Sequence, residues 1–350
     1  MSGKRGSSFT TPLLSKRLAA EKDGLPHPAD SFRQPTIQVR INDIGLLHQV
    51  VQIGSSVNHI SELTVFNGEI TFKGMDPSQL SCYIAKIAVE TPDFPPTASG
   101  FHGPFFVDLT LVEPGLNIKL YEKLNHSFNQ DAFLLLRIRP NERISLSMAG
   151  FSDQRIPYSG RHRIMLLDSS PVCVAIDALV YIYTVKFPVS DLKAILNQLF
   201  QMKFSEIEFS IYNSVSGQHS ALRIFAKSLR NECEHNFFSY GPPESEMCFS
   251  GESMASSEPG GPNCPEPMDI GDMRLVLCQT FLLTNINNVI KPMRDHTVRF
   301  SFEKEQPVCI RSDFNSNSQF QYFLSFVCPD GDTPGSESMP SIPESSSVVE

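Results

Sequence analysis

Residue types that often carry catalysis are present in this chain, but not at spacings that build an active site. The eight cysteines include no Cys-x-x-Cys pair, and the nine histidines lie apart from any recognisable Cys or Asp partner motif. The chain also lacks a phosphate loop ending in Gly-Lys-Ser/Thr, a Gly-x-Ser-x-Gly elbow and a His-Glu-x-x-His helix. We therefore expect no enzyme activity, no metal site and no cofactor.

Two short motifs match known sites only in part. Residues 330–335 begin like a calcium-binding loop, but its twelfth position is Ser341, so the bidentate glutamate is missing. Asn125 lies in a glycosylation sequon, yet a helix is predicted there, and residues 1–17 lack the apolar run of a secretion signal. With no stretch that approaches a membrane span, we expect no membrane partner and reduced thiols in a cytosolic or nuclear setting.

Composition indicates a folded, acidic protein with three segments outside its core. The 350 residues are 41% hydrophobic and 19% charged, which is enough for two or three compact units. The net charge of −9 excludes a simple cationic coat for nucleic acid, although a local basic surface remains compatible with it. Residues 1–35, 240–273 and 329–350 are too polar to offset the entropy of ordering. We expect a tail, an acidic disordered insert and an acidic disordered tail.

The rest of the chain repeats one unit four times: a strand, a short amphipathic helix and a hairpin. The predicted helices begin near positions 42, 118, 190 and 283. In the first unit, Asn67-Gly68 lies between alternating apolar residues, which is the strongest short-range signal for a hairpin. Four such units predict an α+β fold of two similar domains, with helices on one face and sheet on the other. The exposed sheet edges would pair if subunits closed a symmetric ring.

Four stretches, in this order and spacing, resemble the sliding clamps of the proliferating cell nuclear antigen family. The resemblance covers residues 36–328 and implies the DNA-clamp fold, with its sheets outside and its helices inside a ring. It also implies an N-terminal domain at 36–162, a connecting loop at 163–181 and a C-terminal domain at 182–328 that contains the insert. The stretches are ITFKGMDPSQLSCYIAKI, GLNIKLYEKLNHSFNQDAFLLL, HRIMLLDSSPVCVAIDALVYIYTVKFPVSDLKAIL and FLLTNINNVIKPMRDHTVRFSFEKEQPVCIRSDFNSNSQFQYFLSFV.

The resemblance implies a processivity factor that encircles double-stranded DNA and docks DNA polymerase and other replication and repair proteins. Its subunits would form a homotrimer, and its contacts to phosphates would carry no sequence information. The first predicted helix, at 42–53, contains no Lys or Arg, unlike most of the family, which argues against DNA contact there. The DNA-facing residues implied by the resemblance are Lys119, Lys123, His126, Lys193, Asn197, Lys203, Lys291 and Arg294.

The family also docks short peptides in an apolar pocket beneath the connecting loop. Val174 and Ile176 are the more informative positions, because apolar residues in a connector have little structural reason to be there. We expect the subunit seam between strands near 143–150 and 221–229. The pocket residues implied by the resemblance are Met75, Gln79, Leu80, Val174, Ile176, Pro307 and Phe323.

The long N-terminal tail, the acidic insert and the altered inner-face residues favour a divergent clamp, for example from a large DNA virus. Such a protein would work in the nucleus or at a viral replication site in the cytoplasm. Two alternatives remain: a checkpoint-type subunit of a heterotrimeric clamp, and a monomeric or dimeric viral processivity factor held to DNA by charge. Salt separates the last from a ring, because electrostatic binding falls steeply between about 50 and 200 mM salt. An enzyme with an unfamiliar site is the least favoured reading.

Overall fold

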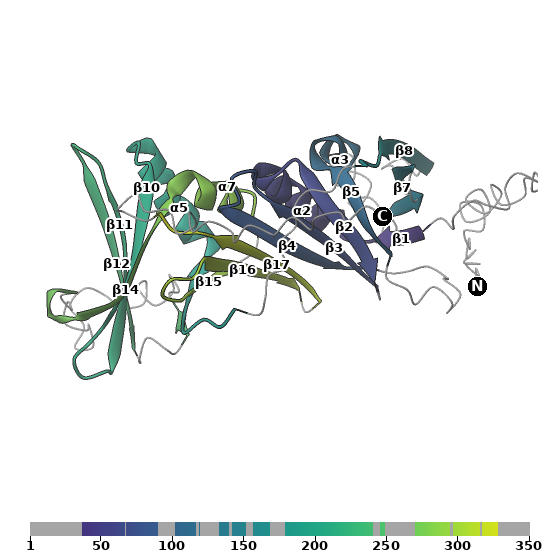
Figure 1. The fold of residues 1–350 in the computed structure, drawn as a ribbon. Coiled ribbons are helices and arrows are strands. Elements are labelled where there is room, and N and C mark those ends of the chain that lie inside the picture. Colours follow the sequence, from purple (N-terminus) through teal and green to yellow (C-terminus); the bar gives the residue numbers. More distant parts are fainter. Residues whose placement is uncertain are drawn as a thin grey trace, which may run out of the picture. The chain divides into compact units, whose positions relative to one another are not determined.

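The computed structural model describes residues 37–66, 68–89, 102–116, 119, 133–139, 142–151, 157–168, 179–240, 246–248, 270–294, 297–315 and 317–327. All of them belong to one compact unit, Ile37–Glu350 (Figure 1). Its helices are α2 (Ile44–Val57), α3 (Leu109–Leu116), α5 (Val189–Gln201) and α7 (Leu283–Ile290), with a 3-10 turn at Ile270–Asp272. Its strands are β1 (Ile37–Ile41), β2 (Ile60–Phe66), β3 (Glu69–Met75), β4 (Ser81–Ala88), β5 (His102–Asp108), β6 (Phe133–Arg139), β7 (Arg143–Phe151), β8 (Pro157–Met165), β9 (Tyr183–Pro188), β10 (Glu206–Asn213), β11 (His219–Lys227), β12 (Glu232–Tyr240), β13 (Met247–Cys248), β14 (Arg274–Leu282), β15 (Thr297–Phe302), β16 (Val308–Asn315) and β17 (Ser318–Leu324).

The strands form three sheets whose orders reveal an internal duplication. One sheet has the order β1-β6-β7-β8, a second has β12-β11-β10-β14, and the third has β13-β9-β15-β16-β17-β4-β3-β2-β5. The row β5-β2-β3-β4 therefore repeats as β14-β10-β11-β12, and the row β1-β6-β7-β8 repeats as β9-β15-β16-β17. Among the described residues, each half carries two helices in corresponding places. The prediction of an α+β fold with two similar halves is confirmed.

Within the nine-stranded sheet, the two halves meet at the pairing of β17 with β4. The two strands are antiparallel, and their register runs from Gln319 opposite Lys86 to Leu324 opposite Ser81. Helices α2, α5 and α7 lie along one face of this sheet (Figure 1), and α2 contacts both α3 and α7. The helices thus form one continuous layer across the joint between the halves.

Helix α2 shows how the sequence fixes its own position. Asp43 begins it, because the Asp43 carboxylate accepts a hydrogen bond from the amide of Leu46 at 2.8 Å. Its apolar stripe is buried against the sheet. At Gly54 the helix comes so close to β4 that an added Cβ atom would lie 2.6 Å from the Tyr83 hydroxyl. The Tyr83 hydroxyl is itself fixed by a hydrogen bond to Ser61 Oγ at 2.9 Å.

The core of the second half is built from phenylalanine. Phe209 on β10 stacks on Phe300 of β15, with ring centroids 5.5 Å apart, and also meets Phe302 at 5.6 Å. Phe187 of β9 meets Phe300 edge to face at 5.8 Å. These four rings are at most 1% exposed. Such burial ties β10 of one sheet to β9 and β15 of another.

The helix predicted near 118 falls almost wholly outside the described residues, and the one residue described there, Lys119, is helical. A helix that the sequence analysis did not predict, α3, begins at Leu109, where the Asp108 carboxylate accepts the Thr110 amide at 2.9 Å. One prediction of local structure needs correction. The acidic insert is structured in part: Met247 of β13 pairs in parallel with Val185 of β9 and is fully buried. Beside it, the Glu246 carboxylate receives a 2.7 Å hydrogen bond from Arg299 Nε. An apolar anchor and an ion pair therefore fix residues that composition alone assigns to a disordered loop.

No helix in the described part of the chain is long and apolar enough to cross a membrane. Among the same residues, no group of three or more His, Cys, Asp or Glu side chains is arranged to hold a metal ion.

Candidate functional site: a helical face and an outer pocket

The predicted DNA-facing residues are positioned mainly by α5, α7 and the turns that follow them. Lys203 lies just after α5 with φ of 63°, and its amide donates to the Phe200 carbonyl at 3.0 Å. Lys291 directly follows α7 and donates its amide to Asn287, while Arg294 lies three positions further on. These three cations and Asn197 of α5 are exposed. The structure thus places four predicted residues on or beside neighbouring helices.

Lys193 is placed differently from the other predicted cations. Its ammonium group donates to the backbone carbonyl of Met293 at 2.5 Å and is only partly exposed. Because Met293 lies three residues after the end of α7, this bond ties α5 to the segment after α7. A structural role therefore accounts for Lys193. Lys119 is exposed beyond α3, and Lys123 and His126 lie outside the described residues.

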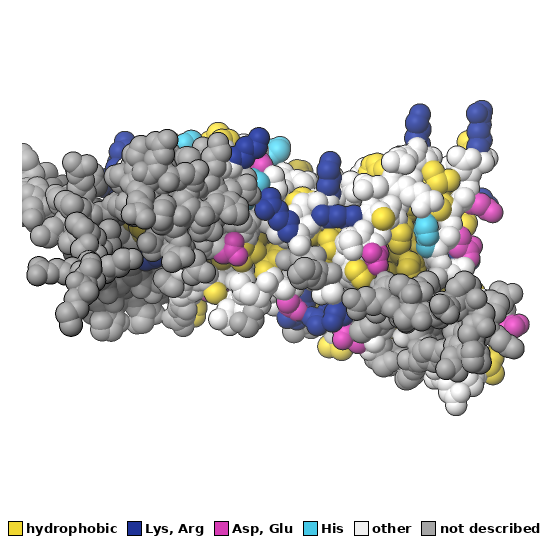
Figure 2. Space-filling model, turned by 180° about the vertical axis from the view of Figure 1, so that it is seen from behind, with side chains coloured by type: hydrophobic (Ala, Val, Ile, Leu, Met, Phe, Trp, Pro, Cys, Tyr) yellow, Lys and Arg dark blue, Asp and Glu magenta, His cyan; other side chains and the backbone are white. Residues whose placement is uncertain are grey.

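Helix α2 contributes no Lys or Arg to this face, as its sequence predicts. Instead, Gln52 of α2 donates to the Glu113 carboxylate of α3 at 3.0 Å, and His48 Nε2 lies 3.8 Å from the same oxygen. Figure 2 shows Lys and Arg side chains in separate groups on the face it views, not as one continuous basic area. Over the described helices, positive charge is thus concentrated on the second half of the chain.

Residues predicted for the peptide pocket lie at the joint between the two halves. Cross-strand pairing aligns Cys309, Phe323, Cys82 and Met75 in one row across β16, β17, β4 and β3. Phe323, Cys309 and Met75 are between 7% and 8% exposed. The row is an apolar strip on the face opposite the helices, because Phe323 alternates with Tyr322, which packs in the main core.

Burial also sets the chemistry of the two thiols in this strip. Desolvation, followed by the nearby Asp76 charge, raises the pKa of Cys82 to about 11. Desolvation raises the pKa of Cys309 to about 12. Both groups are therefore neutral thiols near pH 7 and behave as small apolar side chains, not as nucleophiles.

The rim of the strip is formed by the turn between β3 and β4. The Asp76 carboxylate organises this turn by accepting hydrogen bonds from the Leu80 amide at 3.0 Å and from Ser81 Oγ at 3.1 Å. Gln79 takes φ of 60°, and Leu80 is left 45% exposed. The Leu80 carbonyl accepts the Ser325 amide at 2.9 Å, which holds the turn beside the end of β17. An exposed apolar side chain is thus fixed next to the strip.

The end of the connecting loop reaches the same place. The Tyr181 hydroxyl donates to the Pro307 carbonyl at 3.0 Å, so the segment before β9 is fastened beside β16. Val180 and Ile182, on either side of Tyr181, are 74% and 48% exposed. The structure therefore gathers Met75, Gln79, Leu80, Pro307 and Phe323 around one apolar strip. Val174 and Ile176 lie outside the described residues.

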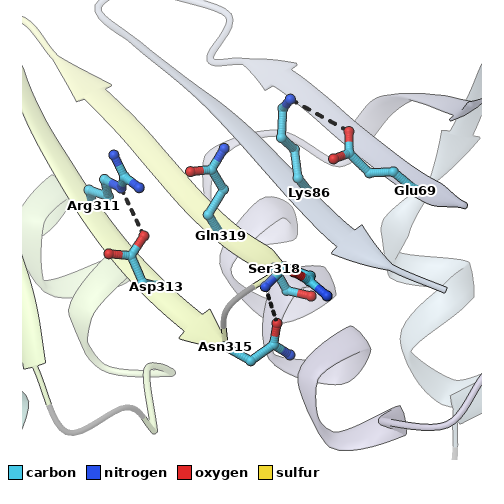
Figure 3. A pocket seen from close by; sticks show the side chains of 8 residues that line it. Glu69, Lys86, Arg311, Asp313, Asn315, Ser318 and Gln319 are labelled. Atoms are coloured by element: carbon cyan, nitrogen blue, oxygen red, sulfur yellow. Dashed lines mark hydrogen bonds and ion pairs between the residues drawn. The ribbon is translucent and has the colours of Figure 1, made fainter. Parts of the chain in front are cut away.

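A polar cavity, which the sequence analysis did not predict, lies further along the sheet face that carries the apolar strip. It has a volume of about 510 Å³ (Figure 3). Lys86 faces Glu69 at 3.5 Å, and Arg311 Nε donates to Asp313 at 2.8 Å, so each cation in it has its own carboxylate. Its only signal in the sequence is the polar alternation of these strands. The lining residues are Glu69, Lys86, Arg311, Asp313, Asn315, Asn317, Ser318 and Gln319.

The predicted subunit seam is wrong. Residues 143–150 belong to β7, which pairs with β6 and β8, and residues 221–229 begin in β11, which pairs with β10 and β12. The free edges of these two sheets include β8 and β12, which have no second partner strand among the described residues. Their sequences, PYSGRHRIM and ECEHNFFSY, lack a clean apolar alternation and therefore do not predict strands.

Comparison with solved structures identifies the fold. A proliferating cellular nuclear antigen from Entamoeba histolytica superposes with a TM-score of 0.56 at 12% sequence identity, over 83% of this chain and 99% of that one. A PCNA2-PCNA3 complex from Sulfolobus tokodaii superposes with a TM-score of 0.57 at 13% identity, over the same shares of the two chains. No family model matches the chain, and no curated protein matches it in sequence. The chain therefore has the sliding-clamp fold of PCNA.

Proposed function

We propose that this chain is the subunit of a sliding clamp: a non-enzymatic ring that encircles double-stranded DNA and tethers DNA polymerase and other clamp-binding proteins to it. The PCNA clamp fold supports this proposal. Two further features agree with it: a layer of helices with exposed cations, and an apolar strip on the opposite face of the sheet.

The internal duplication is the observation that carries the proposal. In the second half, β17 ends a row of four strands and pairs with β4 of the first half. In the first half, β8 ends the corresponding row and has no such partner among the described residues, while β12 holds the place that corresponds to β4. The pairing of β17 with β4 can therefore be repeated between β8 of one copy and β12 of the next. Such a head-to-tail contact closes a ring when its rotation closes.

On this proposal, the helical layer faces the DNA, and Lys203, Lys291 and Arg294 contact phosphates. Contacts of this kind position the duplex without reading bases, which permits sliding. The apolar strip with Leu80 at its rim would take the apolar side chains of a docked peptide. We place the protein where replication occurs, in the nucleus or at a cytoplasmic viral replication site.

A heteromeric ring is the second candidate. One of the structural neighbours is a complex of two different clamp chains, PCNA2 and PCNA3. The free edges β8 and β12 would serve equally well to join this chain to a different clamp subunit. Self-association of the purified chain distinguishes the two candidates.

Topological retention on DNA tests the proposal. The protein is loaded on nicked circular DNA, and the complex is passed through a sizing column at about 0.5 M salt, where purely electrostatic binding has collapsed. A closed ring stays on the circle and is lost after the DNA is linearised. Equal loss from circular and linear DNA would contradict the proposal and favour a factor held by charge.

A further inference from the structure

The free edge strands β8 and β12 carry opposite charges. Arg161 and Arg163 are exposed on β8, and Glu232 and Glu234 are exposed on β12. The members of each pair are two positions apart, so they lie on one face of their strand. On β8 this face points away from the core, because the adjacent Ile164 is buried within the core.

The same contrast extends over the two sheets. Cross-strand pairing puts Arg163 in one row with Ser145 and Arg137, and it puts Arg143 beside Arg139. The face that carries β8 is therefore rich in arginine, whereas the corresponding face beside β12 carries four glutamates together with Arg223 and Lys227. The arginines are Arg40, Arg137, Arg139, Arg143, Arg161 and Arg163, and the glutamates are Glu206, Glu208, Glu232 and Glu234.

The duplication determines which residue of β12 corresponds to which residue of β4. Helices α3 and α7 start alike: the Leu109 amide donates to the His59 carbonyl at 2.7 Å, and the Leu283 amide donates to the Ser205 carbonyl at 2.9 Å. This match aligns β2 with β10. Following the cross-strand pairs outward, Leu63–Phe72–Ala85 in the first half corresponds to Phe209–Ile224–His235 in the second. Cys82 and Ile84 of β4 thus correspond to Glu232 and Glu234 of β12.

The same procedure relates β8 to β17. Val39 of β1 and Val185 of β9 are fully buried and occupy corresponding strands. Following the cross-strand pairs, Val39–Leu136–Leu146–His162 corresponds to Val185–Phe300–Ile310–Tyr322. In both rows the two middle residues are ten positions apart, so the hairpins between them match in length. Arg161 and Arg163 of β8 thus correspond to Gln321 and Phe323 of β17.

Within the chain, Gln321 lies opposite Ile84, and Phe323 lies opposite Cys82. We infer that β8 of one copy pairs antiparallel with β12 of a second copy of this chain, with Arg161 opposite Glu234 and Arg163 opposite Glu232. This inference rests on the proposed ring and specifies how its subunits are joined. Because the register comes from backbone pairing in the other half, it is independent of the charges that it brings together.

The charge pairs make the joint directional. Opposite charges directly across two strands attract, and like charges in that position repel. Pairing of β8 with β8 would oppose arginines, and pairing of β12 with β12 would oppose glutamates. Only head-to-tail contact, with β8 of one copy against β12 of the next, brings opposite charges together at both edges. This is the contact that builds a ring. Since these side chains are exposed, the attraction weakens as salt rises.

Charge reversal of the full-length chain tests the inference, with sedimentation velocity over a range of concentrations as the readout. The β8 variant carries Arg161→Glu and Arg163→Glu, the β12 variant carries Glu232→Arg and Glu234→Arg, and the fourfold variant carries all these changes. Each double variant is expected to self-associate about tenfold more weakly or worse, because two attractive pairs become repulsive. The fourfold variant is expected to regain self-association and to exclude the unchanged chain from mixed oligomers.

The matched control is Arg139→Glu with Arg143→Glu, which changes the net charge equally on the same sheet but on the inner strands β6 and β7, whose two edges are both already paired within the chain. It is expected to assemble like the unchanged chain. Circular dichroism and the unfolding midpoint establish that each variant is folded.

The possible failures are distinguishable. If both double variants assemble as well as the unchanged chain, the inferred charge register is wrong, but the proposed ring is not contradicted. A folded fourfold variant that stays as weak as the double variants would also overturn the register. If the unchanged chain remains a monomer at every concentration, the self-pairing and the proposed homomeric ring both fail.

Discussion

Phe323 of β17 lies directly opposite Cys82 of β4, and this contact joins the two halves of the chain. Both residues lie on the sheet face away from the helices, where Phe323 is only 8% exposed. The joint that makes the nine-stranded sheet continuous therefore also forms the apolar strip proposed to hold peptides. If this strip holds peptides, fold stability and partner docking are coupled at this place, so tests of docking must use residues at its rim.

Leu80→Ala is such a test. Leu80 is 45% exposed, so its truncation should leave the free energy of unfolding within about 0.5 kcal/mol of the original value. If Leu80 contacts a docked peptide, the substitution should weaken binding of a clamp-binding peptide about tenfold, as measured by isothermal calorimetry. Val215→Ala is the control, because Val215 is 92% exposed and lies in the turn between β10 and β11. Equal affinities for the two variants would exclude Leu80 from the docking surface.

Gly54→Ala tests the packing of α2 on the sheet. The new methyl group would lie 2.6 Å from the Tyr83 hydroxyl, and Tyr83 is buried and hydrogen-bonded to Ser61. We expect a loss of about 1–3 kcal/mol in the free energy of unfolding, measured with urea. Gly45→Ala in the same helix is the control. A Cβ there meets Asp43 only at 3.4 Å, so the higher helix propensity of alanine should leave stability unchanged or slightly raised. Equal losses of unfolding free energy in both variants would show that the close approach of Gly54 to Tyr83 does not cause the destabilisation.

Glu208→Gln tests an ion pair on the outer face of the sheet that contains β12. Burial alone would raise the pKa of Glu208, but hydrogen bonds from Ser210 and Arg223 outweigh it and lower that pKa. The Arg223 Nη2 to Glu208 Oε1 distance is 2.8 Å. A carboxylate with a lowered folded-state pKa stabilises the fold above its unfolded pKa, and this contribution is lost as pH falls through the folded pKa.

The variant should therefore be about 1 kcal/mol less stable than the original chain at pH 7, and the difference should shrink below pH 4. Denaturant unfolding over a series of pH values provides the measurement. Glu206→Gln, at an exposed position on the same strand, should show no comparable difference. A loss for Glu208→Gln that stays constant between pH 7 and pH 3 would point to packing instead of charge.

Lys203→Ala with Lys291→Ala tests the proposed DNA path. Each removed phosphate contact should lower the salt slope of DNA binding by about 0.9, and processivity should fall while the oligomer stays intact. Lys73→Ala with Lys304→Ala is the charge-matched control, because these lysines lie on β3 and in the turn after β15, away from the helical layer. An unchanged product length in primer extension, together with an unchanged salt slope, would remove both residues from the DNA path.

Much of the fold was predictable because it rests on local signals. The predicted hairpin is present: Phe66 of β2 lies opposite Glu69 of β3, and Gly68 takes the positive φ, 77°, that such a hairpin requires. The stripe of α5, with buried Leu192, Leu196 and Leu199, follows the helical period. Such patterns act within a few residues. They therefore predict the same local structure in any fold that buries the same face.

The edge strands β8 and β12 and the joint between β17 and β4 were less predictable, for physical reasons. In β8 and β12 the positions facing the core include His162 and Cys233, so apolar alternation is weak and the strands are not evident. The role of Lys193 depends on a carbonyl one hundred positions away, at Met293. By contrast, five predicted pocket residues do come together, because the resemblance to a known family carries long-range information that the local pattern lacks.

The measurement that tests the central claim most directly is the absolute mass of the unchanged chain in solution, determined by light scattering over a wide concentration range. The proposed homotrimeric clamp predicts a mass near 117 kDa, three times the 39.0 kDa of one chain. A mass near 39 or 78 kDa at every concentration would contradict a self-closing ring. It would then favour a subunit that requires a different partner, or a factor held to DNA by charge.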